Sequence, residues 1–155
     1  VIGPEVNGED FERSATEEFI RRSNALPPMK GVVELIKKAK EHGLKLGIAT
    51  SATKKKPVFH LKRLGLLEYF DAFSTADICR NIKPAPDLFL KAAELLGAAP
   101  AECLAVEDSG NGLISANRAG MRCLLVPNNI TRYCEFEPCY RRVESLEEVE
   151  LVEIE

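Results

Sequence analysis

Long hydrophobic runs, an excess of basic residues and paired cysteine motifs are all missing from this sequence of 155 residues. No apolar segment reaches the length needed to cross a bilayer, and the first residues do not follow the pattern of a secretory signal peptide. The net charge of −3 gives no basis for binding nucleic acid or an anionic membrane surface. The composition therefore predicts a globular cytoplasmic protein whose partners include neither nucleic acid nor membranes.

The cysteines form no C-x-x-C pair, and their number, five, is odd. Cys103 and Cys123 lie in or beside apolar segments, which indicates small side chains of the core. Cys134 and Cys139 lie in a segment that is typical of a loop. A zinc site or a disulfide at this second pair is an open alternative, although the sequence offers no further pair of ligands for a metal.

Helical periodicity and short buried apolar runs alternate along most of the chain. Helices are expected at 9–23, 32–42, 53–64, 87–96 and 111–119, and strands at 44–50, 70–74, 103–106, 122–126 and 140–143, with a last helix-like segment near Glu147. Strands that alternate with helices of this length are typical of parallel βαβ units. The sequence therefore predicts an α/β fold with a doubly wound parallel sheet.

The first predicted helix differs from the others because it precedes the alternating pattern. Phe11, Ala15, Phe19 and Ile20 give it an apolar face among charged residues, and prolines follow it at 27–28. We interpret residues 1–26 as part of a different structural unit from residues 27–155.

Polar residues stand where the predicted parallel strands end or where the following loops begin. Thr50 and Ser51 follow one strand, Lys83 lies in the loop before a helix, and Glu107 and Asp108 follow another strand. The carboxyl ends of parallel strands meet on one rim of a sheet, which is where open α/β folds bind ligands. A hydroxyl with free backbone N–H groups, an ammonium group and two carboxylates together suit a phosphate beside Mg²⁺.

Each of these residues also has a structural interpretation without a ligand. Thr50 can be the N-cap of the next helix, and Lys83 can be a solvated loop lysine. Glu107 and Asp108 can be solvated acids at the start of the helix that Ser109 caps. Their common placement on one rim favours the phosphate and metal site over these alternatives.

Three segments resemble signature motifs of the haloacid-dehalogenase-type phosphohydrolases. They read Leu46-Gly-Ile-Ala-Thr-Ser-Ala52, Ile82-Lys-Pro-Ala-Pro-Asp87 and Val106-Glu-Asp-Ser-Gly-Asn-Gly-Leu113, and they are similar to the second, third and fourth motifs of that family. The branch that contains β-phosphoglucomutase, phosphoglycolate phosphatase and sugar-phosphate phosphatases is the most similar. The resemblance implies a Rossmann-like core and Mg²⁺ as the cofactor.

The resemblance also implies a role for each residue on the rim. Thr50 would bind the transferring phosphoryl group with help from the backbone of Ser51, and Lys83 would stabilise its charge. Asp108 would coordinate Mg²⁺, with Glu107 as a second ligand or as a partner of the ligands.

The family's nucleophile is the first Asp of an Asp-x-Asp motif at the end of its first core strand, and no two aspartates of this chain have that spacing. The resemblance therefore implies an amino-terminally truncated member, with a remnant of the helical cap domain at 1–26 and an incomplete core at 27–155. The missing strand would be central. Its neighbours would face a gap with unpaired backbone groups, or would close together in a new register.

These implications predict an Mg²⁺-dependent phosphatase of a small phosphorylated metabolite, of the sugar phosphate or phosphoglycolate type, that is inactive without its nucleophile. A non-catalytic remnant that binds phosphate, metal or a partner chain is one alternative, and a site completed by a separate polypeptide is another. A phosphotransferase like β-phosphoglucomutase is a third, but Ala52, Thr53 and Lys54 replace the Ser-Lys-Asn-like set of the mutase. The sequence gives no oligomeric state, although open strand edges would favour dimers.

Overall fold

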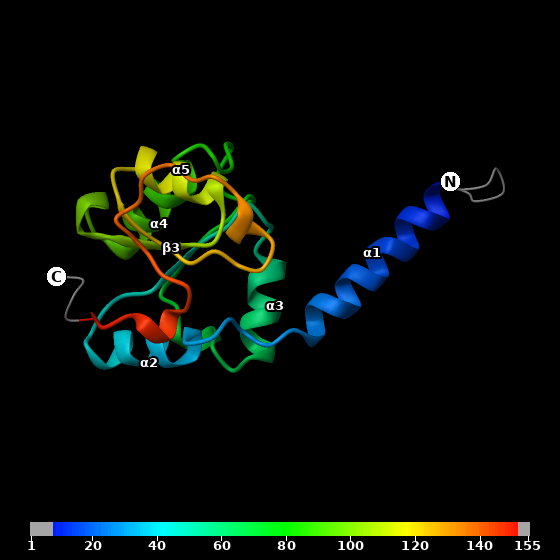
Figure 1. Ribbon diagram of the computed structural model, residues 1–155, viewed down its shortest axis with the longest axis horizontal. Helices are drawn as coiled ribbons and strands as arrows, with labels where there is room; N and C mark the ends of the chain where they lie inside the picture. Colours follow the sequence, from blue (N-terminus) through cyan, green and yellow to red (C-terminus); the bar gives the residue numbers. More distant parts are fainter. Residues whose placement is uncertain (1–7, 152–155) are drawn as a thin grey trace.

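The computed structural model describes residues 8–151, and its elements follow the predicted order (Figure 1). The helices are α1 (Gly8–Ala25), α2 (Val32–Glu41), α3 (Lys55–Arg63), α4 (Asp87–Leu96) and α5 (Gly110–Arg118). The strands are β1 (Gly47–Ala49), β2 (Ala72–Ser74), β3 (Leu104–Glu107), β4 (Arg122–Leu125) and β5 (Arg141–Arg142). The short 3₁₀ helices are η1 (Leu67–Tyr69), η2 (Pro100–Glu102), η3 (Thr131–Tyr133) and η4 (Leu146–Glu148). The predicted α/β class is confirmed; several strands are shorter than expected, and η1, η2 and η3 were not predicted.

Local signals fix several of the helix ends. Ser109 caps α5 as predicted, since its hydroxyl accepts a hydrogen bond from the N–H of Gly112 at 3.1 Å. Gly97 adopts the left-handed conformation that closes α4. Thr50 does not cap α3, because that helix has Lys54 at its N-cap. The structural interpretation of Thr50 as a helix cap is therefore wrong.

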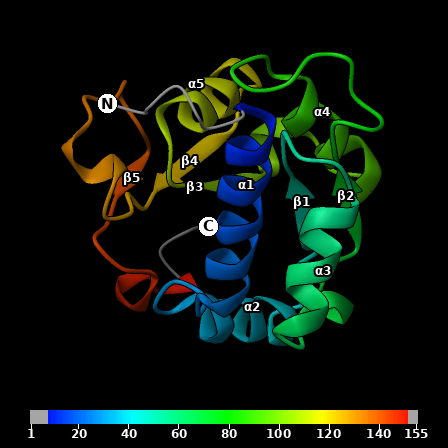
Figure 2. The same cartoon turned by 90° about the vertical axis from the view of Figure 1, so that its right-hand side faces the viewer.

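The strands form two separate parallel sheets instead of one. β1 pairs with β2, and β4 lies between β3 and β5 in the second sheet. Figure 2 shows β1 and β2 on one side of the molecule and β3, β4 and β5 on the other. Among the described residues no strand pairs with the edges of β1 and β3 that are left free. β1 and β3 are therefore not paired with each other in a new register.

Helices α4 and α5 cover one face of both sheets. α4 contacts β1 and β2, and α5 contacts β3 and β4. Phe89 of α4 packs in one cluster with Ala105 of β3 and Leu113 of α5, and Ala49 of β1 lies against the same cluster. This shared core joins the two sheets on that face, even though their backbones are not paired.

The opposite face of the second sheet is covered by α2 and η4. Leu124, Val126 and Leu146 form a second buried cluster, against which Val32 and Leu35 of α2 pack. The burial of apolar side chains on both faces is typical of parallel sheets.

The predicted core cysteines are confirmed as such. Cys123 of β4 is buried in the first cluster, and Cys103 packs against it. Burial, helped by the negative charge of Glu107, raises the pKa of the Cys123 thiol to about 12. Cys123 is therefore a protonated core side chain at neutral pH and not a nucleophile. Cys134 is exposed and Cys139 half-buried, both as free thiols.

Helix α1 projects away from the rest of the molecule (Figure 1). Ile20 is half exposed, but the side chains of Phe11, Ala15 and Phe19, which make up most of the predicted apolar face, lie outside the described residues. The division of the chain at residue 26 stays a prediction. Within residues 8–151, none of the helices combines the length and the apolar character of a membrane span.

The contact between α2 and η4 requires a glycine at position 31. Gly31 has φ +79°, and a Cβ there would lie 2.4 Å from the backbone nitrogen of Glu147. Gly43 has a similar φ, +73°, but open space around it.

We expect Gly43→Ala to lower the free energy of unfolding by about 1 to 2 kcal/mol, the cost of a left-handed non-glycine residue. Gly31→Ala should cost clearly more, because backbone must also move.

Urea denaturation of both variants measures this difference. Equal losses for Gly31→Ala and Gly43→Ala would show that α2 and η4 are not in the close contact described above.

Candidate active site at the divided edge of the sheet

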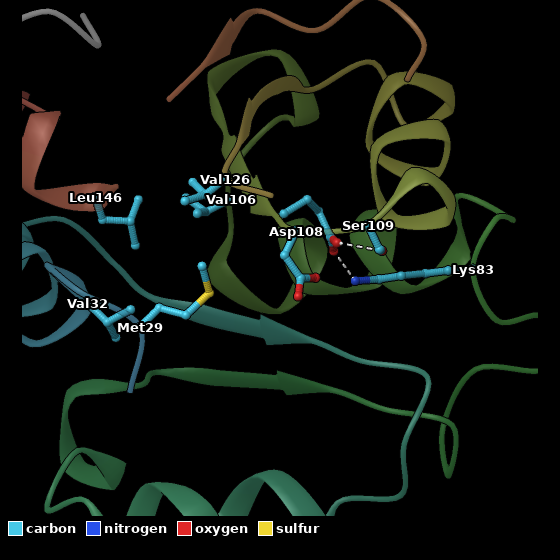
Figure 3. A pocket seen from close by; sticks show the side chains of 9 residues that line it. Met29, Val32, Lys83, Val106, Asp108, Ser109, Val126 and Leu146 are labelled. Atoms are coloured by element: carbon cyan, nitrogen blue, oxygen red, sulfur yellow. Dashed lines mark hydrogen bonds and ion pairs between the residues drawn. The ribbon is translucent and has the colours of Figure 1, made fainter. Parts of the chain in front are cut away.

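An open groove of about 320 Å³ runs beside the free edge of β3. Its polar end is formed by residues at the carboxyl end of that strand, and the remainder is apolar (Figure 3). The lining residues are Met29, Val32, Lys83, Val106, Glu107, Asp108, Ser109, Val126 and Leu146. The groove therefore brings together Lys83, Glu107 and Asp108, as the sequence predicted for the rim.

Lys83 and Glu107 form a buried ion pair. Nζ of Lys83 donates to Oε1 of Glu107, and the two side chains are only 14% and 8% exposed. The same Nζ lies 4.6 Å from the centre of the Phe89 ring, and the Ser109 hydroxyl donates to Oε2 of Glu107 at 3.3 Å. Both oxygens of Glu107 are thus engaged, and a pair with this much burial is costly to break by removing one partner.

Asp108 has a different environment although it is the next residue. Its Oδ2 accepts a hydrogen bond from Nδ2 of Asn128 at 2.8 Å. Its Oδ1 has no hydrogen-bond partner among residues 8–151. In Figure 3 no dashed line joins the Asp108 carboxylate to Lys83. Asp108 is therefore the carboxylate that keeps an oxygen available for a ligand.

Thr50 and Ser51 lie on the other side of the gap, at the end of β1. The backbone N–H of Thr50 donates to the carbonyl of Ser74 at 3.0 Å, and its hydroxyl accepts from the N–H of Ala52 at 3.2 Å. Ser51 is exposed. Neither residue lines the groove beside β3. The structure therefore does not join these two residues with the carboxylates in one cavity.

The donor set at Asp108 fits Mg²⁺ only in part. Mg²⁺ is commonly held by one or two carboxylates together with water molecules. Asp108 offers one free carboxylate oxygen, and Glu107 is engaged with Lys83. Within the described part of the chain no three His, Cys, Asp or Glu residues are grouped so that they could hold a metal. Asp108 thus fits one position of a hydrated Mg²⁺ ion.

Two residues of the site were not found from the sequence. Asn128 and Thr131 follow β4, and both hydrogen-bond to Asp108. The signal was available, because β4 also ends on the rim and polar residues follow it.

The molecule is thus an α/β protein with Lys83, Glu107 and Asp108 grouped at the carboxyl end of β3, where open α/β folds bind ligands. Residues 5–120 match the profile of the family described as haloacid dehalogenase-like hydrolase. The chain belongs to this family.

Relatives of known sequence support this assignment. The chain is 44% identical over 150 residues to YhcW of Bacillus subtilis, an alignment that covers 97% of the chain and 68% of YhcW. It is 36% identical over 144 residues to CbbY of Rhodobacter capsulatus, covering 88% of the chain and 63% of CbbY. It is 37% identical over 124 residues to hexitol phosphatase B of Escherichia coli, covering 74% and 54%. The chain thus spans between about half and two thirds of these relatives.

Solved structures give the same family. The crystal structure of CbbY from Rhodobacter sphaeroides in complex with phosphate is similar with a TM-score of 0.77 and 31% identity. This similarity covers 95% of the chain and 68% of CbbY. The Rossmann-like family core predicted from the motifs is therefore confirmed.

The Lys83–Glu107 pair depends on the absence of a side chain at Gly112. A Cβ on Gly112 would lie 1.7 Å from Oε2 of Glu107, whereas one on Gly110 would meet open space.

Gly112→Ala should displace the Glu107 carboxylate and lower the free energy of unfolding by about 2 kcal/mol or more, the cost of disturbing a buried charge. Gly110→Ala should be neutral or slightly stabilising, since alanine favours helix.

Chemical denaturation of the two variants checks this expectation. If Gly112→Ala were as stable as Gly110→Ala, Glu107 would not be packed against the start of α5.

Proposed function

We propose that the protein is an Mg²⁺-dependent phosphatase of a small phosphorylated metabolite, of the sugar phosphate or phosphoglycolate type. The observation that carries the proposal is the grouping of Lys83, Glu107 and Asp108 at the end of β3 in a member of a hydrolase family. Its relatives support a phosphorylated substrate. CbbY was crystallised with phosphate and, as a variant, with xylulose-1,5-bisphosphate, and hexitol phosphatase B is a phosphatase by name.

The chemistry assigns a different task to each group. The Lys83 ammonium, held in place by Glu107 and Phe89, neutralises the charge of the phosphoryl oxygens. Thr50 and the N–H of Ser51, which lie across the gap from the groove, would donate hydrogen bonds to those oxygens from the end of β1. Asp108 would hold Mg²⁺, which would supply further charge stabilisation to the phosphoryl group. Glu107 acts through Lys83, because both of its oxygens are engaged.

We propose that the nucleophile comes from a segment outside these 155 residues. The chain has no Asp-x-Asp motif, and the raised pKa of Cys123 leaves that buried thiol protonated. We propose that the full protein carries the motif on a strand that lies between β1 and β3. The free edges of these strands support this placement. So does Val106, which is 45% exposed although it lies within β3.

The chain of residues 1–155 should not hydrolyse p-nitrophenyl phosphate in the presence of Mg²⁺, because it lacks the Asp-x-Asp motif that supplies the nucleophile in the family. A colorimetric assay at high enzyme concentration measures this, with Asp108→Ala as the matched control. Turnover that is present in the chain and lost in Asp108→Ala would mean that another residue is the nucleophile.

The proposed activity is tested on a protein that also includes the segment encoded upstream of Val1. The reading frame upstream of Val1 should encode an apolar strand that ends in Asp-x-Asp. The protein that includes this segment should hydrolyse phosphate esters, and replacing the first Asp of the motif by Asn should remove the activity by several orders of magnitude. An upstream sequence with a genuine start signal and no such strand would favour a non-catalytic binding protein instead.

A further inference from the structure

The loop that follows β4 is fastened to Asp108 by side-chain hydrogen bonds. Asn128 donates from Nδ2 to Oδ2 of Asp108 at 2.8 Å. Thr131 donates from its hydroxyl to the backbone carbonyl of Asp108 at 2.6 Å. Both the carboxylate and the main chain of Asp108 are therefore held from the end of a neighbouring strand.

The orientation of the Asn128 amide is determined by its other contacts. Its Oδ1 accepts hydrogen bonds from the backbone N–H groups of Ile130 at 2.8 Å and Thr131 at 3.0 Å. Turning the amide over would set its NH₂ against two N–H donors and its oxygen against a carboxylate. The NH₂ group must therefore face Asp108.

The loop is closed by two further bonds. The backbone N–H of Asn128 donates to the Thr131 hydroxyl at 3.0 Å, and the N–H of Arg132 donates to the carbonyl of Asn128 at 2.9 Å. The Thr131 hydroxyl thus accepts from Asn128 and donates to Asp108. These contacts form one network, so that the Asn128 side chain has little freedom to move relative to the carboxylate.

We propose that Asn128 is a positioning residue, which engages Oδ2 of Asp108 so that Oδ1 is presented to a divalent cation in the groove. The proposal rests on the function proposed above for this site. A neutral amide suits the task because it orients the carboxylate without neutralising it, whereas Lys83 neutralises Glu107. Groups that orient a metal ligand in this way commonly change metal affinity by tenfold or more when they are removed.

The test compares two neighbouring asparagines. Asn128→Ser keeps a side-chain oxygen that can accept from the following backbone N–H groups, but it cannot reach Asp108. Asn129→Ser is the matched control, since Asn129 is exposed and makes no side-chain hydrogen bond to a described residue. Asp108→Ala gives the affinity without the carboxylate. Thr131→Val, which removes the hydroxyl, is a second variant, and like Asn128→Ser it should weaken the binding of the cation.

The readout is the dissociation constant for Mn²⁺, measured on residues 1–155 by the electron paramagnetic resonance signal of the free ion. Mn²⁺ serves as the probe because it shares the preference of Mg²⁺ for oxygen ligands. Melting temperatures without cation are recorded for every variant. We expect Asn128→Ser to bind Mn²⁺ roughly tenfold more weakly than the wild type and Asn129→Ser to bind equally well.

Two outcomes would overturn the proposal. Asn128→Ser with the affinity of Asn129→Ser, even at a lower melting temperature, would show that Asn128 only stabilises the loop. Wild-type affinity no higher than that of Asp108→Ala would show that Asp108 is not presented to a cation. The Mn²⁺ measurements do not depend on hydrolysis. They would therefore keep their meaning even if the longer protein proved not to be a phosphatase.

Discussion

Every buried backbone N–H and C=O group needs a hydrogen-bond partner, and the rest of this structure depends on that constraint. The carbonyl of Glu107 accepts from the N–H of Val126 at 2.7 Å, so the alternation along β3 turns the polar groups of Val106 to the other edge. On β1 the N–H of Thr50 donates to Ser74, and the same alternation turns Ala49 to the free edge. Two strands thus face each other with backbone groups that no described strand satisfies.

Side chains hold the two sheets together where the backbone does not. Phe89 of α4 shares its core cluster with Ala105 of β3, while Ala49 of β1 packs against the same cluster. The buried pair of Lys83 and Glu107 ties the loop that follows β2 to the end of β3. The groups that we assign to phosphate and metal binding therefore lie at the junction of the two sheets, where the backbones are not paired. A strand inserted there would complete the sheet and bring its own end to the site.

The sequence was sufficient where the determinants are local. Helix α4 was predicted with its observed ends because its apolar period and Gly97 lie within a dozen residues. The meeting of Lys83 with Glu107 followed from the rule that parallel strands end on one rim. Lys83 engages Glu107 and not Asp108. The Glu107 carboxylate packs against Gly112, and no local sequence pattern shows this contact. The contact of Asn128 with Asp108 is likewise a product of tertiary structure.

Amide hydrogen exchange along β1 and β3 tests the divided sheet most directly. If the sheet is divided, the amides of Val106 and Ala49, which face the gap, should exchange at least about 100-fold faster than those of Ala105 and Ile48, which face a paired strand. Nuclear magnetic resonance resolves these four amides individually. Strong and equal protection of all four would contradict a divided sheet, because it would mean that the edges of β1 and β3 are already paired in this chain.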